Sequence, residues 1–239
     1  MAQSGPPRTA RARARDELTR EIKDTARHQL AGHGSAGLSL RAVAREMGMV
    51  SSAIYRYFPS RDDLLTARIV DAYNAVGAAA ELAESAVRRG DLVGRWMAVA
   101  RAARHWALAH PQEYALIFGS PVPGYAAPAD TVDPAARIPL LVLQILADAD
   151  EGGQVPSSTG RPMPRAVRAD MTALRRLVAP RLSEPVLARA VLAWTELVGS
   201  ISFELFGHLH GVVVDYAAYF DYQMRGIGQD LGLIPRTVG

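Results

Sequence analysis

The sequence predicts an all-α protein, and three observations support this fold class. Apolar residues recur at intervals of three and four along most of the 239-residue chain, which is the spacing of one helix face. Alanine and leucine are abundant, whereas the alternating runs typical of strands are scarce. Hydrophobic residues make up 49% of the chain, so the helices have enough apolar side chains for a sizeable core.

The first part of the chain predicts a basic arm followed by two helices. Residues 1–15 are predicted to be disordered. Residues 16–31 carry one apolar stripe, and the glycines within residues 32–37 end that helix. Ser39 is a favoured N-cap for a short helix, whose inner face consists of Leu40, Val43, Ala44 and Met47.

A tight turn and a second short helix come next. Gly48 suits a turn between two helices, and residues 50–58 are predicted to be helical until Pro59 stops them. Ser60 with Asp63 three residues later resembles a capping box, so a long helix begins there. This order predicts a helix-turn-helix domain at residues 16–70.

Residues 71–239 predict a larger helical domain. Helices are expected at residues 91–109, 111–118, 135–149, 183–209 and 215–231. Two loops rich in proline and glycine separate them, at residues 119–134 and 150–164. The last two helices are long and apolar. Their candidate subunit-contact residues, each of which could equally pack within one chain, are Leu192, Val198, Ile201, Leu205, Phe220 and Ile227.

Charge is distributed unevenly between these parts. Residues 1–68 contain 12 Lys and Arg against 7 Asp and Glu, a net charge of +5, whereas the whole chain carries +3. A basic front end on a near-neutral body favours a polyanion as partner. The arginines of the arm, Arg8, Arg11, Arg13 and Arg15, would then add electrostatic affinity. The alternative is a solvated basic tail.

Composition and motifs exclude several classes of site. The chain has no cysteine, which excludes disulfides, thiolate metal sites and a cysteine nucleophile. The first 15 residues lack the apolar centre of a secretory signal, and no apolar run reaches the roughly 18 residues of a membrane span. We therefore expect a cytoplasmic protein without a membrane segment. Because no catalytic set, phosphate-binding glycine loop or metal spacing beyond His208 and His210 stands out, no enzyme activity, cofactor or metal is predicted.

The helix predicted at residues 50–58 has two different faces. At about 100° per residue, Val50, Ile54 and Phe58 lie on the inner side. The outer side carries Ser51, Ser52, Tyr55 and Arg56, with Tyr57 near its edge. Hydroxyl groups and arginine bind phosphate oxygens, arginine also reads guanine, and a tyrosine ring packs on a thymine methyl group. The outer face thus favours DNA, the alternative being a helical hairpin whose tyrosines cover the core edge.

The larger domain offers candidate residues for a ligand pocket. They are aromatic or polar side chains between residues 70 and 210: Trp96, His105, Trp106, Tyr114, Phe118, Trp194, Glu196 and Phe203. Plain core packing is the alternative for each. Glu196 lies within an otherwise apolar helix, so we predict a buried carboxylate with Arg101, Arg104, His105 or a ligand as its partner.

The segment "LSLRAVAREMGMVSSAIYRYFPSRDDLL" resembles the DNA-binding domain of the TetR/AcrR family of transcriptional regulators, and the resemblance covers roughly residues 14–66. It implies a role for Tyr55 at bases or phosphates and for Ser39 and Tyr57 at phosphates, while Arg61 matches the basic residue after the serine cap. Val50 and Ala53 replace residues that usually carry a hydroxyl, so we expect the helix cap to pass to Ser51. The DNA-binding residues expected on both grounds are Ser39, Arg41, Ser51, Ser52, Ala53, Tyr55, Arg56, Tyr57 and Arg61.

The resemblance also implies how such a protein works. It implies an all-helical homodimer, a repressor that binds a palindromic double-stranded operator and is released by a small hydrophobic effector. A second segment, "AWTELVGSISFELFGHLHG", resembles the Trp-His-Gly-containing C-terminal domain of one group of these regulators. The alternative function is an all-helical small-molecule-binding protein or enzyme that binds no operator.

Overall fold

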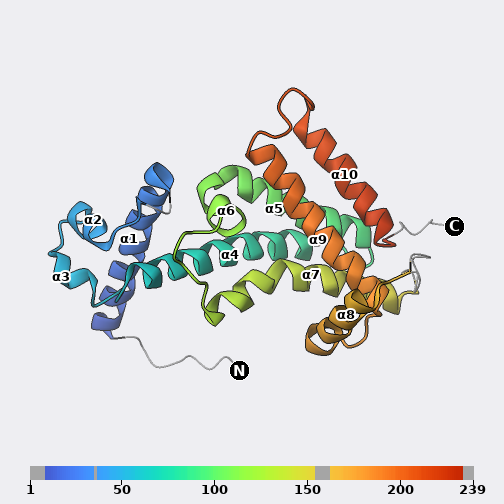
Figure 1. Cartoon of the computed structure of the whole chain (residues 1–239), viewed down its shortest axis with the longest axis horizontal. Helices are drawn as coiled ribbons and strands as arrows, with labels where there is room; N and C mark the ends of the chain where they lie inside the picture. The colour runs from blue at the N-terminus through green and yellow to red at the C-terminus, as the bar shows by residue number, and fades with distance from the viewer. Residues whose placement is uncertain (1–8, 35–36, 154–161, 234–239) are drawn as a thin grey trace.

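The computed structural model describes residues 9–34, 37–153 and 162–233. Regular structure in these ranges consists of α-helices and one 3-10 turn, η2, at Ala129–Thr131 (Figure 1). The helices are α1 (Ala10–His33), α2 (Leu40–Glu46), α3 (Ser51–Ile54), α4 (Arg61–Ser85), α5 (Leu92–Ala109), α6 (Pro111–Phe118), α7 (Val132–Glu151), α8 (Arg165–Val178), α9 (Glu184–Leu205) and α10 (Tyr216–Asp230). The predicted all-α fold class is confirmed.

The N-terminal domain is a small bundle around its own apolar core. Its helices are α1, α2, α3 and the first turns of α4 (Figure 1). The core consists of fully or nearly fully buried side chains from all four helices, among them Ile22, Val43, Ile54, Leu64 and Leu65. Burying these side chains fixes the angle between α2 and α3.

The larger domain packs α5, α6, α7, α9 and α10 with the rest of α4 around a second core. Trp96 of α5 is fully buried, and its Nε1 donates to the Met224 carbonyl of α10 at 2.7 Å. Tyr114 of α6 places its hydroxyl 2.9 Å from the Val198 carbonyl and 2.9 Å from Ser202 Oγ, both on α9. Trp96 and Tyr114 therefore each have their polar atom satisfied inside the core.

Helix α4 belongs to both domains. Leu64, Leu65 and Ile69 are buried in the first core, and Ala72 and Val76 in the second. Between them, Arg68 is buried and pairs with Asp71 at 3.2 Å and with Glu113 of α6. Lys23 of α1 reaches the same Asp71 at 2.8 Å. A chain of ion pairs thus runs from α1 through α4 to α6.

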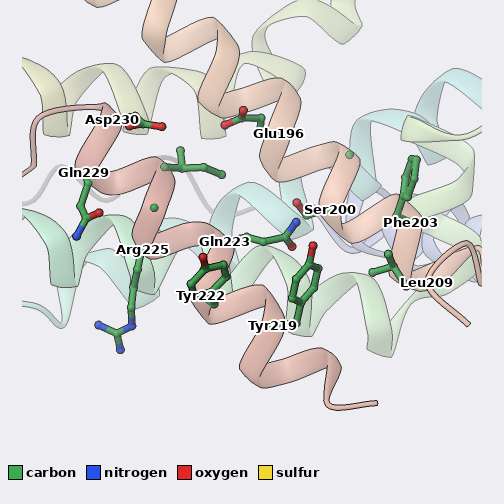
Figure 2. Close-up of a pocket in the computed structure, with 13 residues that line it drawn as sticks. Glu196, Ser200, Phe203, Leu209, Tyr219, Tyr222, Gln223, Arg225, Gln229 and Asp230 are labelled. Atoms are coloured by element: carbon green, nitrogen blue, oxygen red, sulfur yellow. The ribbon is translucent and has the colours of Figure 1, made fainter. Parts of the chain in front are cut away.

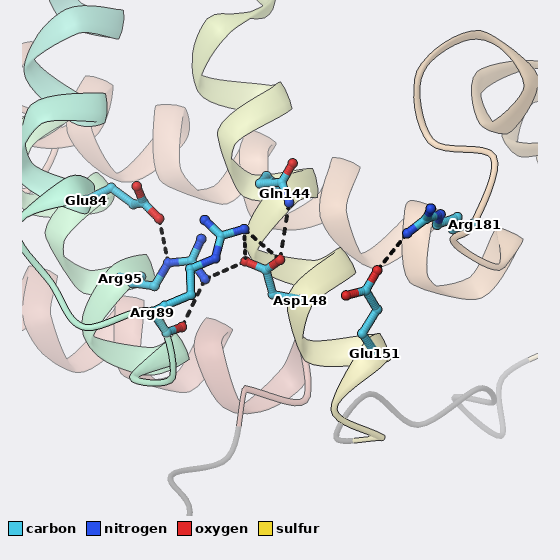
Figure 3. A network of polar contacts seen from close by, with 7 residues as sticks. All are labelled: Glu84, Arg89, Arg95, Gln144, Asp148, Glu151 and Arg181. Carbon is cyan, nitrogen blue, oxygen red and sulfur yellow. Dashed lines mark hydrogen bonds and ion pairs between the residues drawn. The ribbon is translucent and has the colours of Figure 1, made fainter.

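A second ionic network lies at the far end of α4 (Figure 3). Arg95 of α5 is fully buried and donates to Glu84 at 2.5 Å, to Asp148 of α7 at 2.7 Å and to the Arg89 carbonyl at 3.2 Å. The exposed Arg89 binds the same Asp148 at 2.8 Å. This network ties α4, α5 and α7 together.

Most predicted helices are present, and Ser39 and Ser60 occupy the predicted N-cap positions of α2 and α4. Asp63 N donates to Ser60 Oγ at 3.1 Å, which is the first bond of the predicted capping box. The second bond differs, because the Asp63 carboxylate accepts from the Ser60 hydroxyl at 2.7 Å. Asp91 caps α5, and α6 begins and ends at the predicted residues. These features depend on short-range rules that the sequence alone provides.

Other predictions were wrong. Helix α1 begins at Ala10, where Thr9 accepts a capping bond from the Ala12 amide, so residues 10–15 are helical rather than disordered. Residues 1–8 of the predicted arm, including Arg8, lie outside the described residues. Helix α7 begins at Val132, inside a predicted loop, and α8 was not predicted at all.

Candidate DNA-binding surface

Helices α2 and α3 form the predicted helix-turn-helix unit. Gly48 lies in the turn with φ of 66°, a conformation that favours glycine. The Met49 amide donates to the Ala44 carbonyl at 2.8 Å and closes the turn. Buried Val43 and Ala44 of α2 meet buried Ile54 of α3 in the N-terminal core. These contacts hold the inner face of the unit and leave its outer face to solvent.

The outer face of α3 carries the predicted polar residues. Ser51, Ser52 and Arg56 are exposed, and 43% of the Tyr55 side chain is accessible. Ala53 is half-buried between them. The structure therefore brings two hydroxyl groups, a phenol and a guanidinium to one surface, a set suited to phosphates and base edges.

The recognition helix is shorter than predicted, and the predicted inward position of Val50 is wrong. Helix α3 spans only Ser51–Ile54, and the chain continues in turns through residues 55–57. Val50 occupies the N-cap position and is 72% exposed, so it does not pack on the core as predicted. Ser51 is the first helical residue and not the cap. Because the helix is a single turn, the 100° rule describes Ser51 to Ile54 but does not extend back to Val50, which lies outside the helix.

Three further predicted residues surround this face. Ser39 is the N-cap residue of α2 and half-buried, without a capping bond from its side chain. Arg41 is exposed on α2. Arg61, at the start of α4, donates through Nε to the Leu38 carbonyl at 3.2 Å. Arg61 thus links the start of α4 to the loop before α2.

One contact on this surface was not foreseen. Arg15, assigned to the arm by sequence, lies in α1, and its Nη2 donates to the Arg56 carbonyl at 3.0 Å. Its guanidinium carbon also lies 5.1 Å from the ring centre of the half-buried Tyr57. Arg15 therefore contacts the chain just after α3. Its basic, polar sequence context gave no signal for this contact, which depends on how α1 docks.

The predicted ligand-pocket residues do not gather around one cavity. Trp96, Trp106 and Tyr114 are buried core residues, whereas His105 is exposed. Phe118 and Trp194 are half-buried, with ring centres 5.7 Å apart, and Phe118 also lies 5.0 Å from Tyr114. Burial raises the pKa of Tyr114 to about 12, so its hydroxyl keeps its proton at neutral pH. For these aromatic residues, the core-packing alternative describes the structure.

The prediction for Glu196 was wrong. Its side chain is exposed on α9 rather than buried. Arg101 binds Asp221 of α10, and Arg104 makes two hydrogen bonds to Glu204 of α9, at 2.6 and 2.7 Å. The two arginines that were predicted as partners of Glu196 therefore pair with other carboxylates.

Glu196 and Phe203 instead line an open groove of about 870 Å³ between α9 and α10 (Figure 2). Helix α10 contributes Tyr219, Tyr222 and Arg225 to the lining of this groove. Phe203 is 54% exposed and Tyr222 74% exposed. We call the following residues the α9–α10 face, all of them exposed except the half-buried Gly199: Leu192, Glu196, Gly199 and Phe203 on α9, with Tyr219, Tyr222, Gly226 and Asp230 on α10.

Two smaller cavities lie elsewhere. One, of about 350 Å³, is bordered by Leu30 of α1, by Gln112 and Leu116 of α6, and by Phe206. The other, of about 360 Å³, lies between α7 and the segment joining α8 to α9. The first is lined by residues of both domains.

Nowhere in residues 9–34, 37–153 and 162–233 do three His, Asp or Glu side chains come together as a metal site would require. Within the same ranges, α9 is the one helix long and apolar enough to cross a membrane, and only 33% of its most apolar 18-residue window is buried. Core helices of globular proteins pass the same test.

Comparison with known proteins agrees with this architecture. The family described as "Bacterial regulatory proteins, tetR family" matches residues 22–67, and "Tetracyclin repressor-like, C-terminal domain" matches residues 96–227. The HTH-type transcriptional regulators Mb1846 of Mycobacterium bovis and Rv1816 of Mycobacterium tuberculosis are each 39% identical to this chain over 220 residues, covering 89% of it and 91% of the relative.

Solved structures show the same relationship. The putative regulatory protein SCO4313 is 36% identical, superposes with a TM-score of 0.76, and the match covers 92% of this chain and 98% of that one. A protein of unknown function from Rhodococcus sp. RHA1 is 27% identical with a TM-score of 0.64, over 87% and 94% of the two chains. The finer resemblance to the Trp-His-Gly group stays a prediction. Two matching domains and relatives that span nearly the whole chain show that this protein belongs to the TetR family of transcriptional regulators.

Proposed function

We propose that this regulator is a cytoplasmic, homodimeric repressor that binds a palindromic operator through α3 and is released by a small hydrophobic effector. The observation that carries the proposal is the exposed face of Ser51, Ser52, Tyr55 and Arg56 on a helix-turn-helix unit whose inner face is buried. A helix with such a face fits the major groove, where its side chains meet base edges.

The first experiment measures operator binding. DNA upstream of the protein's own gene is the first probe, and the affinity is measured at several salt concentrations. A regulator binds with a steep salt dependence, because phosphate contacts release counterions. Tyr55→Ala is expected to weaken operator binding by about 1–3 kcal/mol with an unchanged melting temperature. Arg88→Ala, at an exposed arginine of the larger domain, is the control and leaves binding unchanged.

Dimer formation is assigned to the α9–α10 face. Leu192, Phe203 and Tyr222 are each more than half exposed there, and contiguous apolar surface of this kind marks interaction sites. A second copy placed face to face would cover it as a four-helix arrangement. Binding to a palindromic operator requires such a twofold dimer, with its two α3 helices about 34–36 Å apart, one turn of DNA.

Sedimentation equilibrium tests this assignment. Phe203→Glu and Tyr222→Glu place a charge in the proposed interface and are expected to give monomers with weak operator binding. Leu82→Glu changes an exposed leucine of α4, outside that face, and leaves a dimer. Dimers that persist in both of the first two variants would place the interface elsewhere.

The effector part of the proposal depends on how the domains meet. A ligand weakens DNA binding only if it binds better to a state in which the two α3 helices no longer match adjacent grooves. The cavity of about 350 Å³ is lined by both domains, and its lining combines Leu30, Leu116 and Phe206 with the amide of Gln112. This lining suits a small, mostly apolar molecule.

A thermal-shift screen with hydrophobic compounds tests the effector. A true effector raises the melting temperature of the free protein and also dissociates the operator complex. Compounds that bind without changing operator affinity would contradict this part of the proposal and leave operator binding standing.

A further inference from the structure

Arg15 makes two contacts with one short segment 41 residues further along the chain. Its Nη2 donates to the Arg56 carbonyl at 3.0 Å, and its guanidinium carbon lies 5.1 Å from the ring centre of Tyr57. The start of α1 runs beside the segment that leaves α3 (Figure 1). One side chain thus bridges α1 and the end of the recognition unit.

That segment needs support from outside. Helix α3 has only four residues, and a single helical turn fixes its own conformation weakly. Tyr55 and Arg56, two of the four outer-face residues, lie just beyond its last helical residue. Ile54 and Phe58 anchor the segment in the core from the inner side. Arg15 holds it from the α1 side through the Arg56 carbonyl and the Tyr57 ring.

We propose that Arg15 is a positioning residue for DNA recognition, which orients Tyr55 and Arg56 and does not itself bind phosphate. This inference rests on the proposed operator binding by α3. Guanidinium geometry is essential to it, because arginine can stack on a ring and donate to a carbonyl at the same time. Lysine has the same charge, but its single nitrogen would have to serve both contacts, so it is expected to hold the segment less well.

The salt dependence of operator affinity distinguishes a positioning role of Arg15 from a phosphate contact. The full-length protein is titrated against its operator between low and high salt. Arg15→Ala is expected to weaken binding about five- to tenfold, from the loss of one exposed hydrogen bond and one cation–π contact, with an unchanged salt slope. Arg15→Lys keeps the charge and is expected to show most of the same loss. Arg13→Ala, on the same helix and equally exposed, serves as the control for loss of one positive charge.

Amide hydrogen exchange in the free protein measures how firmly Arg15 holds the segment after α3. In Arg15→Ala, the amides of Arg56, Tyr57 and Phe58 are expected to exchange faster, while those of Val43 and Ala44 in α2 keep their rates. Arg13→Ala leaves both sets unchanged. Tyr57→Leu combined with Arg15→Ala is expected to weaken binding less than the two single effects multiplied, because both remove the same contact.

Several results would overturn the inference. A salt slope flattened by about one unit in Arg15→Ala, with full recovery in Arg15→Lys, would make Arg15 a phosphate contact. Unchanged affinity and unchanged exchange would make it a surface residue without a role. If the unmodified protein itself binds no operator, the proposed function fails first and this inference fails with it, whatever Arg15→Ala does to exchange.

Discussion

Replacing Arg95 by methionine is expected to lower the free energy of unfolding by about 3–5 kcal/mol. The guanidinium is fully buried, and the two carboxylates it binds, Glu84 and Asp148, are only 12% and 17% exposed. Methionine fills much of the same space, so the loss comes mainly from two carboxylates left poorly solvated. At about 2–4 °C per kcal/mol for a chain of this size, the melting temperature is expected to fall by about 6–20 °C.

The matched control is Arg89→Met. Arg89 binds the same Asp148, but its side chain is 65% exposed, so its loss is expected to cost less than about 1 kcal/mol. Urea and thermal unfolding of both variants measure the difference. A variant in which Arg95, Glu84 and Asp148 are all replaced by apolar residues of similar size is expected to recover most of the loss. Equal costs for Arg95→Met and Arg89→Met would refute the argument, because burial would then not decide the energy.

Three further changes test other contacts. The hydrogen bonds from Arg101 lower the pKa of Asp221, so this pair stabilises the fold above the ordinary carboxyl pKa and stops doing so as pH falls through the lowered one. Arg101→Met is therefore expected to cost up to about 1 kcal/mol at pH 7, since both side chains are about one-third or more exposed, and urea unfolding is expected to show a smaller cost as pH falls below the ordinary carboxyl pKa. Gly77→Ala would bring a Cβ within 2.9 Å of Arg137 Cβ, and overpacking of this kind is expected to cost about 1–3 kcal/mol, measured by thermal unfolding. Ser60→Ala removes the cap of α4 and is expected to cost about 1 kcal/mol in the same assay, whereas Ser60→Asp restores most of it.

The sequence predicted the features that depend on near neighbours. The turn at Gly48, the helix cap at Ser60 and the inward position of Ile54 all follow from residues within a few positions of one another. The side of α9 that faces the core cannot be deduced from near neighbours in this way. Its apolar residues cover both the core side and the exposed side, Leu197 being 1% and Leu192 52% exposed, so apolar surroundings in the sequence did not imply burial for Glu196.

Contacts between residues far apart in the sequence could not be predicted either. Arg101 and Arg104 bind carboxylates 120 and 100 residues away, and no local rule selects Asp221 or Glu204 over Glu196. The contact of Arg15 with Arg56 spans 41 residues and depends on how α1 crosses the unit. Helix α8 was not predicted, because no element was assigned between the predicted loop at residues 150–164 and the predicted helix at residues 183–209; in the structure none of its residues is buried.

The sharing of α4 by two cores has a consequence for exchanging parts between regulators. A chimera can join the N-terminal domain of one regulator to the larger domain of another. The junction must lie within α4 between Ile69, which packs in the first core, and Ala72, which packs in the second. Adding or deleting a single residue at the junction would turn the transplanted end by about 100° and shift it by about 1.5 Å. Arg68 would come from one parent and Glu113 from the other, so a working hybrid needs parents that share this ion pair as well as the helical register.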